Sequence, residues 1–196
     1  MLMSVKSNIK PFVKELKKFQ NVDIPNITRI ALNETATRVK ELEQVQMRKS
    51  FDRPKPQTVN SIYVQFAKKN YPIARITFRD WAQEFIYRNI VGGIRRVRNT
   101  AVPTVNARLN QFGNIPGRKS GVVKANQFRA TIDGIYGVWQ RTKNGVKIIH
   151  RFETNPRYNP IFPFYRVANK AVKYVMPLKF EKVAKYYIKK AGYKIR

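Results

Sequence analysis

The sequence predicts an α+β fold: an antiparallel sheet of about four or more strands, flanked by a long helix in the N-terminal half and a kinked C-terminal helix. Residues 26–49 carry an apolar stripe at helical spacing without Gly or Pro, and residues 164–192 carry a second stripe. Strand-like alternation appears in four stretches, residues 58–66, 73–81, 135–141 and 146–153. Because Pro177 removes a backbone N–H, we expect a kink there or two abutting helices.

The N-terminal region predicts two helices joined by a turn. Residues 4–20 place apolar side chains at helical spacing, with lysines between them. Residues 21–26, NVDIPN, are typical of a turn, and Asn26 suits the N-cap of the long helix. That helix would extend for roughly 35 Å. We therefore expect it to pack against other subunits as well as against its own core.

The long helix must end at FDRPKPQTVNS, residues 51–61, because each of its two prolines disfavours the helical conformation of the preceding residue. We expect an aromatic anchor in the core, a local ion pair and side-chain hydrogen bonds at this corner. The residues concerned are Phe51, Asp52, Arg53, Pro54, Pro56 and Asn60. The alternative is a rigid joint between helix and strand without an interface role.

The middle of the chain is less regular. A helix or turn from Trp81 should break at Gly92-Gly93, where two glycines permit positive φ. Residues 99–120 contain two prolines and two glycines, which predicts an extended excursion that is functional or ordered by a partner. Residues 121–131 fit one short helix, and Asn144-Gly145 predicts a tight hairpin turn. We expect residues 1–196 to form a single domain.

Charge and composition restrict the classes of function. The chain has 40 Lys and Arg against 11 Asp and Glu, a formal net charge of +29, while 43% apolar residues suffice for a core. Self-repulsion at this charge favours a polyanion or acidic neighbours as partners. There is no cysteine, no apolar run of membrane-spanning length and no signal-peptide pattern at the start. These features predict a chain that is soluble and intracellular when made.

Catalytic motifs are weak, so we expect neither an enzyme nor a cofactor nor a metal site. The only histidine, His150, lies within a predicted strand, and Glu41 and Glu43 fit surface partners of nearby lysines. GRKSG, residues 117–121, has the wrong length for a phosphate-binding loop. The best remaining signal is basic residues interleaved with apolar ones, as in phosphate-contacting surfaces. The predicted surface for DNA or an acidic partner consists of Arg95, Arg96, Arg98, Arg118 and Lys119.

Five blocks in chain order support a resemblance. They are FDRPKPQTVNSIYV (51–64), GGIRR (92–96), QFGNIP (111–116), GVWQR (137–141) and NPRYNPIFPFYRVA (155–168). Together they resemble phage minor tail proteins of the tail completion family related to the lambda-type protein Z. The chain departs from that pattern in lacking a GKGTPA-like loop between Trp81 and Gly92. It is also shorter between Gly93 and Gln111, and Asn159-Pro160-Ile161 replaces the usual arginines.

The resemblance implies a non-enzymatic virion structural protein at the head-proximal end of a tail or in the neck, assembled in the host cytoplasm. Such proteins form rings, of six subunits or alternatively twelve, between the tail terminator or tube and head-completion or adaptor proteins, around the path of the genomic DNA. No membrane partner is implied. The matching blocks add Gly92, Gly93, Pro156, Arg157 and Tyr158 to the expected corner and interface residues. A free, non-specific nucleic-acid-binding protein is the alternative function.

Overall fold

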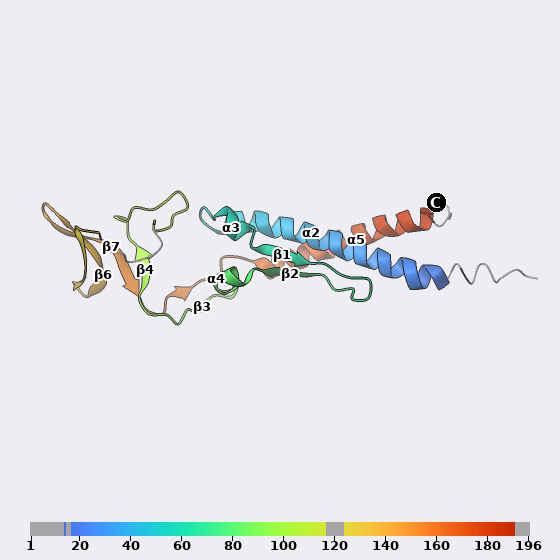
Figure 1. Ribbon diagram of the computed structural model, residues 1–196, viewed down its shortest axis with the longest axis horizontal. Helices are drawn as coiled ribbons and strands as arrows, with labels where there is room; N and C mark the ends of the chain where they lie inside the picture. The colour runs from blue at the N-terminus through green and yellow to red at the C-terminus, as the bar shows by residue number, and fades with distance from the viewer. Residues whose placement is uncertain (1–13, 15–16, 117–123, 191–196) are drawn as a thin grey trace, which may run out of the picture. The chain divides into compact units, whose positions relative to one another are not determined.

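The computed structural model describes residues 14, 17–116 and 124–190, and its contacts divide the chain into two compact units (Figure 1). Unit 1 takes Met1–Gln46, Asn60–Arg79 and Phe164–Arg196, and unit 2 takes Met47–Val59 and Asp80–Pro163. The predicted α+β class is confirmed, with a four-stranded antiparallel sheet, a long helix in the N-terminal half and a long C-terminal helix.

The long helix α2 (Ile24–Ser50) begins earlier than predicted. A π-helical turn, η1 (Phe19–Asp23), leads directly into it, so the turn predicted at residues 21–26 is wrong and Asn26 lies inside the helix. Pro25 is the second residue of α2 and directly follows the wider π-helical turn. The predicted helix over residues 4–20 lies mostly outside the described residues.

In unit 1, one side of α2 supplies much of the core. Most of its buried positions form a row that recurs every four residues, with Ala36 buried beside it. The row consists of Ile27, Ala31, Thr35, Val39 and Glu43. Val45, which the sequence placed on the apolar stripe, is 47% exposed.

The C-terminal helix α5 (Phe164–Lys190) packs against α2 in unit 1. The Thr35 hydroxyl lies 3.4 Å from the sulfur of Met176, and Lys179 Nζ lies 2.9 Å from Glu34 Oε2. The helix continues through Pro177, which rules out the alternative of two abutting helices.

The strands β1 (Ile62–Gln65) and β2 (Arg75–Phe78) form the predicted antiparallel pair, in a two-stranded sheet of their own. The first strand is shorter than predicted because α3 (Pro56–Val59) is a single helical turn. Val59 and Ile62 are out of phase for a single strand, and the structure explains this because Val59 lies in α3 and Ile62 in β1. The Asn33 amide holds the end of this hairpin on α2, since it donates to Ala67 O at 3.1 Å and accepts from Ala67 N at 2.7 Å.

Unit 2 contains the four-stranded antiparallel sheet, with the strand order β4-β7-β6-β5. Its strands are β4 (Thr100–Pro103), β5 (Gln127–Ile132), β6 (Ile135–Thr142) and β7 (Gly145–Glu153). The predicted β6–β7 hairpin is confirmed, although only Gly145 of the Asn-Gly pair has positive φ. One prediction is wrong, because β5 occupies most of the described part of the predicted 121–131 helix. Strand β4 lies within the predicted excursion, and residues 104–116 of that excursion form no helix or strand.

Helix α4 (Asp80–Val91) and the short ladder of β3 (Gly93–Ile94) with β8 (Arg157–Tyr158) complete unit 2. The predicted helix break at Gly92-Gly93 is confirmed. No helix in the described ranges is long and apolar enough to cross a membrane.

Candidate functional site

The proline corner is anchored by a cluster of aromatic side chains in unit 2. The Phe51 ring centroid lies 5.7 Å from that of Phe85 and 5.8 Å from that of Phe162. Phe162 is 1% exposed, so Phe51 docks on a buried ring. Phe51 itself is half-buried, so it packs at the edge of the core rather than inside it. Aromatic pairs of this geometry contribute roughly 1 kcal/mol each beyond burial.

Asp52 and Arg53 form the predicted local ion pair. Arg53 Nη2 lies 3.0 Å from Asp52 Oδ2, and Arg53 Nε donates to Oδ1 at 3.2 Å. These hydrogen bonds lower the pKa of Asp52 below its ordinary value. Because both side chains are more than half exposed, the pair contributes little to stability. The pair helps to position Arg53, which has a positive φ of 43° and whose guanidinium lies against Gly113.

Pro54 and Pro56 follow the ion pair, and Pro56 is the first residue of α3, where a missing N–H is harmless. The predicted corner set is nevertheless divided between the units. Asn60 belongs to unit 1, where its Oδ1 accepts from Gln44 Nε2 at 3.3 Å.

A hollow lies beside the corner in unit 2, and we call it the aromatic notch. Its volume is ≈ 350 Å³, and it is open to solvent. Residues from the corner, from α4 and from the segment after β4 line it. They are Phe51, Asp52, Arg53, Pro54, Lys55, Gln57, Thr58, Trp81, Phe85, Phe112 and Asn114. Sequence reasoning found the corner residues but missed Trp81, Phe85 and Phe112, because nothing in the sequence places these three segments together.

The two glycines and the PRY segment, which are far apart in the chain, meet in the β3–β8 ladder. Gly93 pairs with Tyr158, and Ile94 pairs with Arg157. Arg95 N extends the ladder by donating to Pro156 O at 3.0 Å. Gly92 has a φ of +76°, and a Cβ there would lie 3.1 Å from Pro160 Cδ and from Tyr158 O. Glycine is favoured at this position because the positive φ strains any other residue and because a Cβ would also force Tyr158 or Pro160 to shift.

Arginines gather along this ladder. Arg96 and Arg98 are exposed and have no ion pair within the described ranges, and the same holds for Arg157. Arg95 Nε lies 3.4 Å from Glu84 Oε1. Arg88, which the sequence did not single out, donates from Nη1 to Ile94 O at 3.1 Å. Arg118 and Lys119, also predicted for this surface, lie outside the described residues.

Two titratable groups are buried away from these surfaces. His150 is buried within β7, and burial lowers its pKa, as fits an ordinary strand residue. Glu43 was expected at the surface but is fully buried, and neither carboxyl oxygen has a hydrogen-bond partner in the described part of the chain. Burial raises the pKa of Glu43 from 4.5 to about 8, and the backbone N–H of Ala168, which does not reach hydrogen-bond geometry, offsets only part of this effect.

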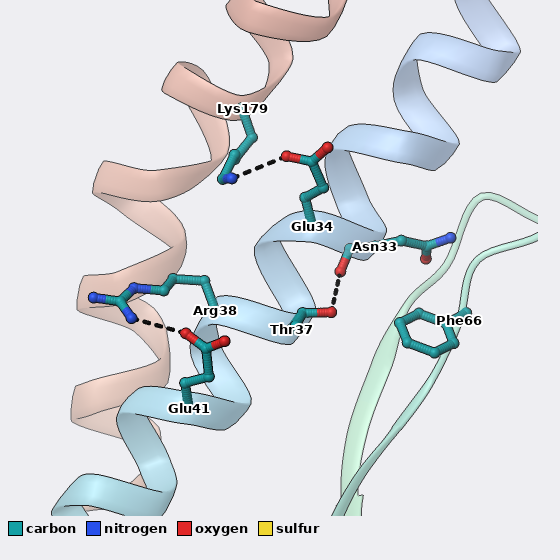
Figure 2. A pocket seen from close by; sticks show the side chains of 7 residues that line it. All are labelled: Asn33, Glu34, Thr37, Arg38, Glu41, Phe66 and Lys179. Atoms are coloured by element: carbon teal, nitrogen blue, oxygen red, sulfur yellow. Dashed lines mark hydrogen bonds and ion pairs between the residues drawn. The ribbon is translucent and has the colours of Figure 1, made fainter.

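A second hollow, of ≈ 320 Å³, lies in unit 1 between α2, Phe66 and Lys179. Figure 2 shows Lys179 pointing to Glu34 and Arg38 pointing to Glu41, with a separation of 2.8 Å in the second pair. The sequence predicted that Glu41 pairs with a nearby lysine, whereas it pairs with Arg38. The positive and negative charges of this hollow balance, and Phe66 at its edge is 58% exposed.

Within residues 14, 17–116 and 124–190, no cluster of three or more His, Asp or Glu side chains could hold a metal ion. Comparisons with protein-family models, with curated proteins and with solved structures find no match.

Proposed function

We propose that the chain is a non-enzymatic structural protein of a phage virion, which completes the head-proximal end of the tail and joins it to the head around the DNA path. It acts as a subunit of a closed ring with cyclic symmetry, of six copies or alternatively twelve, in contact with neighbouring tail and neck proteins. The proposal extends the resemblance of the five sequence blocks.

One observation supports the proposal above all others: blocks that are distant in sequence adjoin each other in unit 2. Arg53 of the FDRPKP block lies against Gly113 of QFGNIP. Gly92 of GGIRR lies against Tyr158 and Pro160 of the NPRYNPIFP block. Phe162 of that same block packs on Phe51. Residues from four of the five blocks thus adjoin each other in unit 2, whereas GVWQR lies in β6.

Charge and exposed apolar surface support assembly. Against a formal net charge of +29, six ion pairs are found within the described residues, so most of the cations require counter-charge from outside the chain. Many large apolar side chains are also exposed, among them Leu178 at 66% and Tyr174 at 60%. Surfaces of this kind mark contacts with other proteins.

Deletion of the gene from the phage tests the proposal. We expect filled heads and detached tails by electron microscopy, and a small fixed copy number of the protein in purified wild-type particles by mass spectrometry. Normal virions formed without the protein would reject the proposal.

A free, non-specific nucleic-acid-binding protein remains the second candidate, because the net charge of +29 favours it. Under that function, affinity for bare DNA falls steeply with salt, with a slope that scales with the number of phosphates neutralised. The protein would then be absent from purified particles.

A further inference from the structure

The aromatic notch exposes apolar surface that the rest of unit 2 leaves uncovered. Trp81 and Phe85 lie four residues apart on α4, so their side chains share one face of that helix. They are 52% and 45% exposed, although both line a concave site. Concave sites lined by aromatic side chains are where partners insert anchor side chains.

The charged residues that line the notch leave one cation unpaired. They are Asp52, Arg53 and Lys55, and Asp52 is paired with Arg53. Within the described ranges, no carboxylate lies at ion-pair distance from Lys55. The α4 wall carries Asp80 and Glu84, of which Glu84 is paired with Arg95. The site therefore combines an apolar hollow with an unpaired lysine at its wall.

We infer that the aromatic notch binds an acidic segment of a different protein, which inserts an aromatic or large aliphatic side chain beside Trp81 and places its carboxylates near Lys55. The inference rests on the proposed function, since it names the kind of neighbour that this assembly protein contacts. A second copy of the chain, which the proposed ring also brings close, fits less well at this site because it offers only 11 acidic residues among 40 basic ones. Nucleic acid fits less well because a strand needs a track of cations along its phosphates, whereas Lys55 is the one cation lining the notch that has no ion pair within the described residues.

The full-length protein and a short synthetic peptide test the inference. The peptide carries one phenylalanine between runs of aspartate and glutamate, and calorimetry measures its affinity at moderate salt. The matched peptides replace the phenylalanine with alanine, or the acidic residues with glutamine. We expect saturable binding of the first peptide and about tenfold weaker binding of each matched peptide. The fluorescence of Trp81 should also change, because Trp139 is only 7% exposed and does not line the notch.

Two variants assign the binding to the notch. Trp81→Ala and Lys55→Glu should each weaken binding by about tenfold or more. Tyr87→Ala is the control for the aromatic change, because Tyr87 is 54% exposed on α4 but does not line the notch. Lys143→Glu, at an exposed turn in the same unit, is the control for the charge change. Both controls should stay within about twofold of the wild type.

The inference is overturned if the acidic peptide does not bind saturably, or if the controls lose as much affinity as the notch variants. It is equally overturned if a single-stranded oligonucleotide binds with the same dependence on Trp81, which would make the notch a nucleic-acid site. A loss of self-association of Trp81→Ala in sedimentation would instead assign the notch to a second copy. Absence of the protein from purified particles would reject the proposed function, whereas failure of the peptide alone would reject only this partner.

Discussion

At the residue scale, Glu43 is the most unusual side chain in the described structure. It is a carboxyl group with no exposed surface, and its oxygens lack hydrogen-bond partners in that part of the chain. Its position in the row of buried α2 residues from Ile27 places it where an apolar residue is expected. Burial of the charged form is so unfavourable that the pKa of Glu43 rises to about 8.

The raised pKa makes stability depend on pH. Because the pKa of Glu43 is 4.5 in its ordinary state and about 8 in the folded chain, the folded chain favours the protonated carboxyl. Its contribution is fully present below about pH 4.5, falls as the pH rises, and is lost completely above about pH 8. Relative to Glu43→Gln, we expect the free energy of unfolding of the wild type to fall by roughly 1.4 kcal/mol per pH unit within this window.

Chemical denaturation of both proteins at a series of pH values measures this difference. His150 also titrates with a shifted pKa, but it is present in both proteins, so its contribution cancels. If the stability of the wild type and of Glu43→Gln changes in parallel from pH 5 to 8, Glu43 has the same pKa in the folded and unfolded chains and the prediction is wrong.

At the scale of the element, the turn after α4 shows how a glycine can be required for two separate reasons. Gly92 and Gly134 have the same φ of +76°. A Cβ at Gly134 would meet nothing within 4 Å, whereas one at Gly92 would lie 3.1 Å from Tyr158 O and from Pro160 Cδ. Gly134 thus needs only the backbone conformation, while Gly92 also needs the space.

Alanine substitutions at the two glycines separate these effects. Gly134→Ala should cost about 1 kcal/mol of unfolding free energy from backbone strain alone. Gly92→Ala should cost about 1–2 kcal/mol more, because the β3–β8 ladder must also move. Denaturant titration of the two variants beside the wild type gives both values. Equal losses of unfolding free energy in the two variants would mean that Tyr158 and Pro160 can move away from the new Cβ without destabilising the fold.

The secondary structure was predictable where a local pattern decides it. Alternation over residues 146–153 predicted β7, and the stripe from Phe164 predicted α5. Strand β5 was missed, although Asp133-Gly134 is a turn signal that both residues confirm with positive φ. Strand β4 could not be found because four residues near a proline carry no period, and pairing with β7 defines the strand.

The candidate site was predictable in its parts but not in its arrangement. The prolines and the Asp52–Arg53 pair are local, so the sequence was enough to expect the corner. The approach of Trp81 and Phe112 to that corner depends on tertiary packing, which no local spacing encodes. Glu43 was misassigned for the same reason, since a carboxylate is expected at the surface and its burial here is set by tertiary packing.

At the scale of the whole molecule, the net charge affects stability. The formal net charge is +29 over 196 residues, and the ion pairs of the described residues lie mostly on exposed side chains, where each contributes little. Repulsion among the remaining cations therefore opposes folding in dilute buffer.

Salt should consequently stabilise the isolated protein. Raising NaCl from about 0.01 M to about 0.1 M shortens the screening length from about 30 Å to about 10 Å, which weakens repulsion between distant cations. We expect Tm by differential scanning calorimetry to rise over this range by several degrees, roughly the effect of 1 kcal/mol in a domain of this size. The triple variant Lys143→Gln, Lys147→Gln and Lys182→Gln removes three exposed cations and should show a shallower rise. A Tm that falls with salt would mean that the exposed ion pairs outweigh the repulsion, and the chain would then need no external counter-charge to be stable.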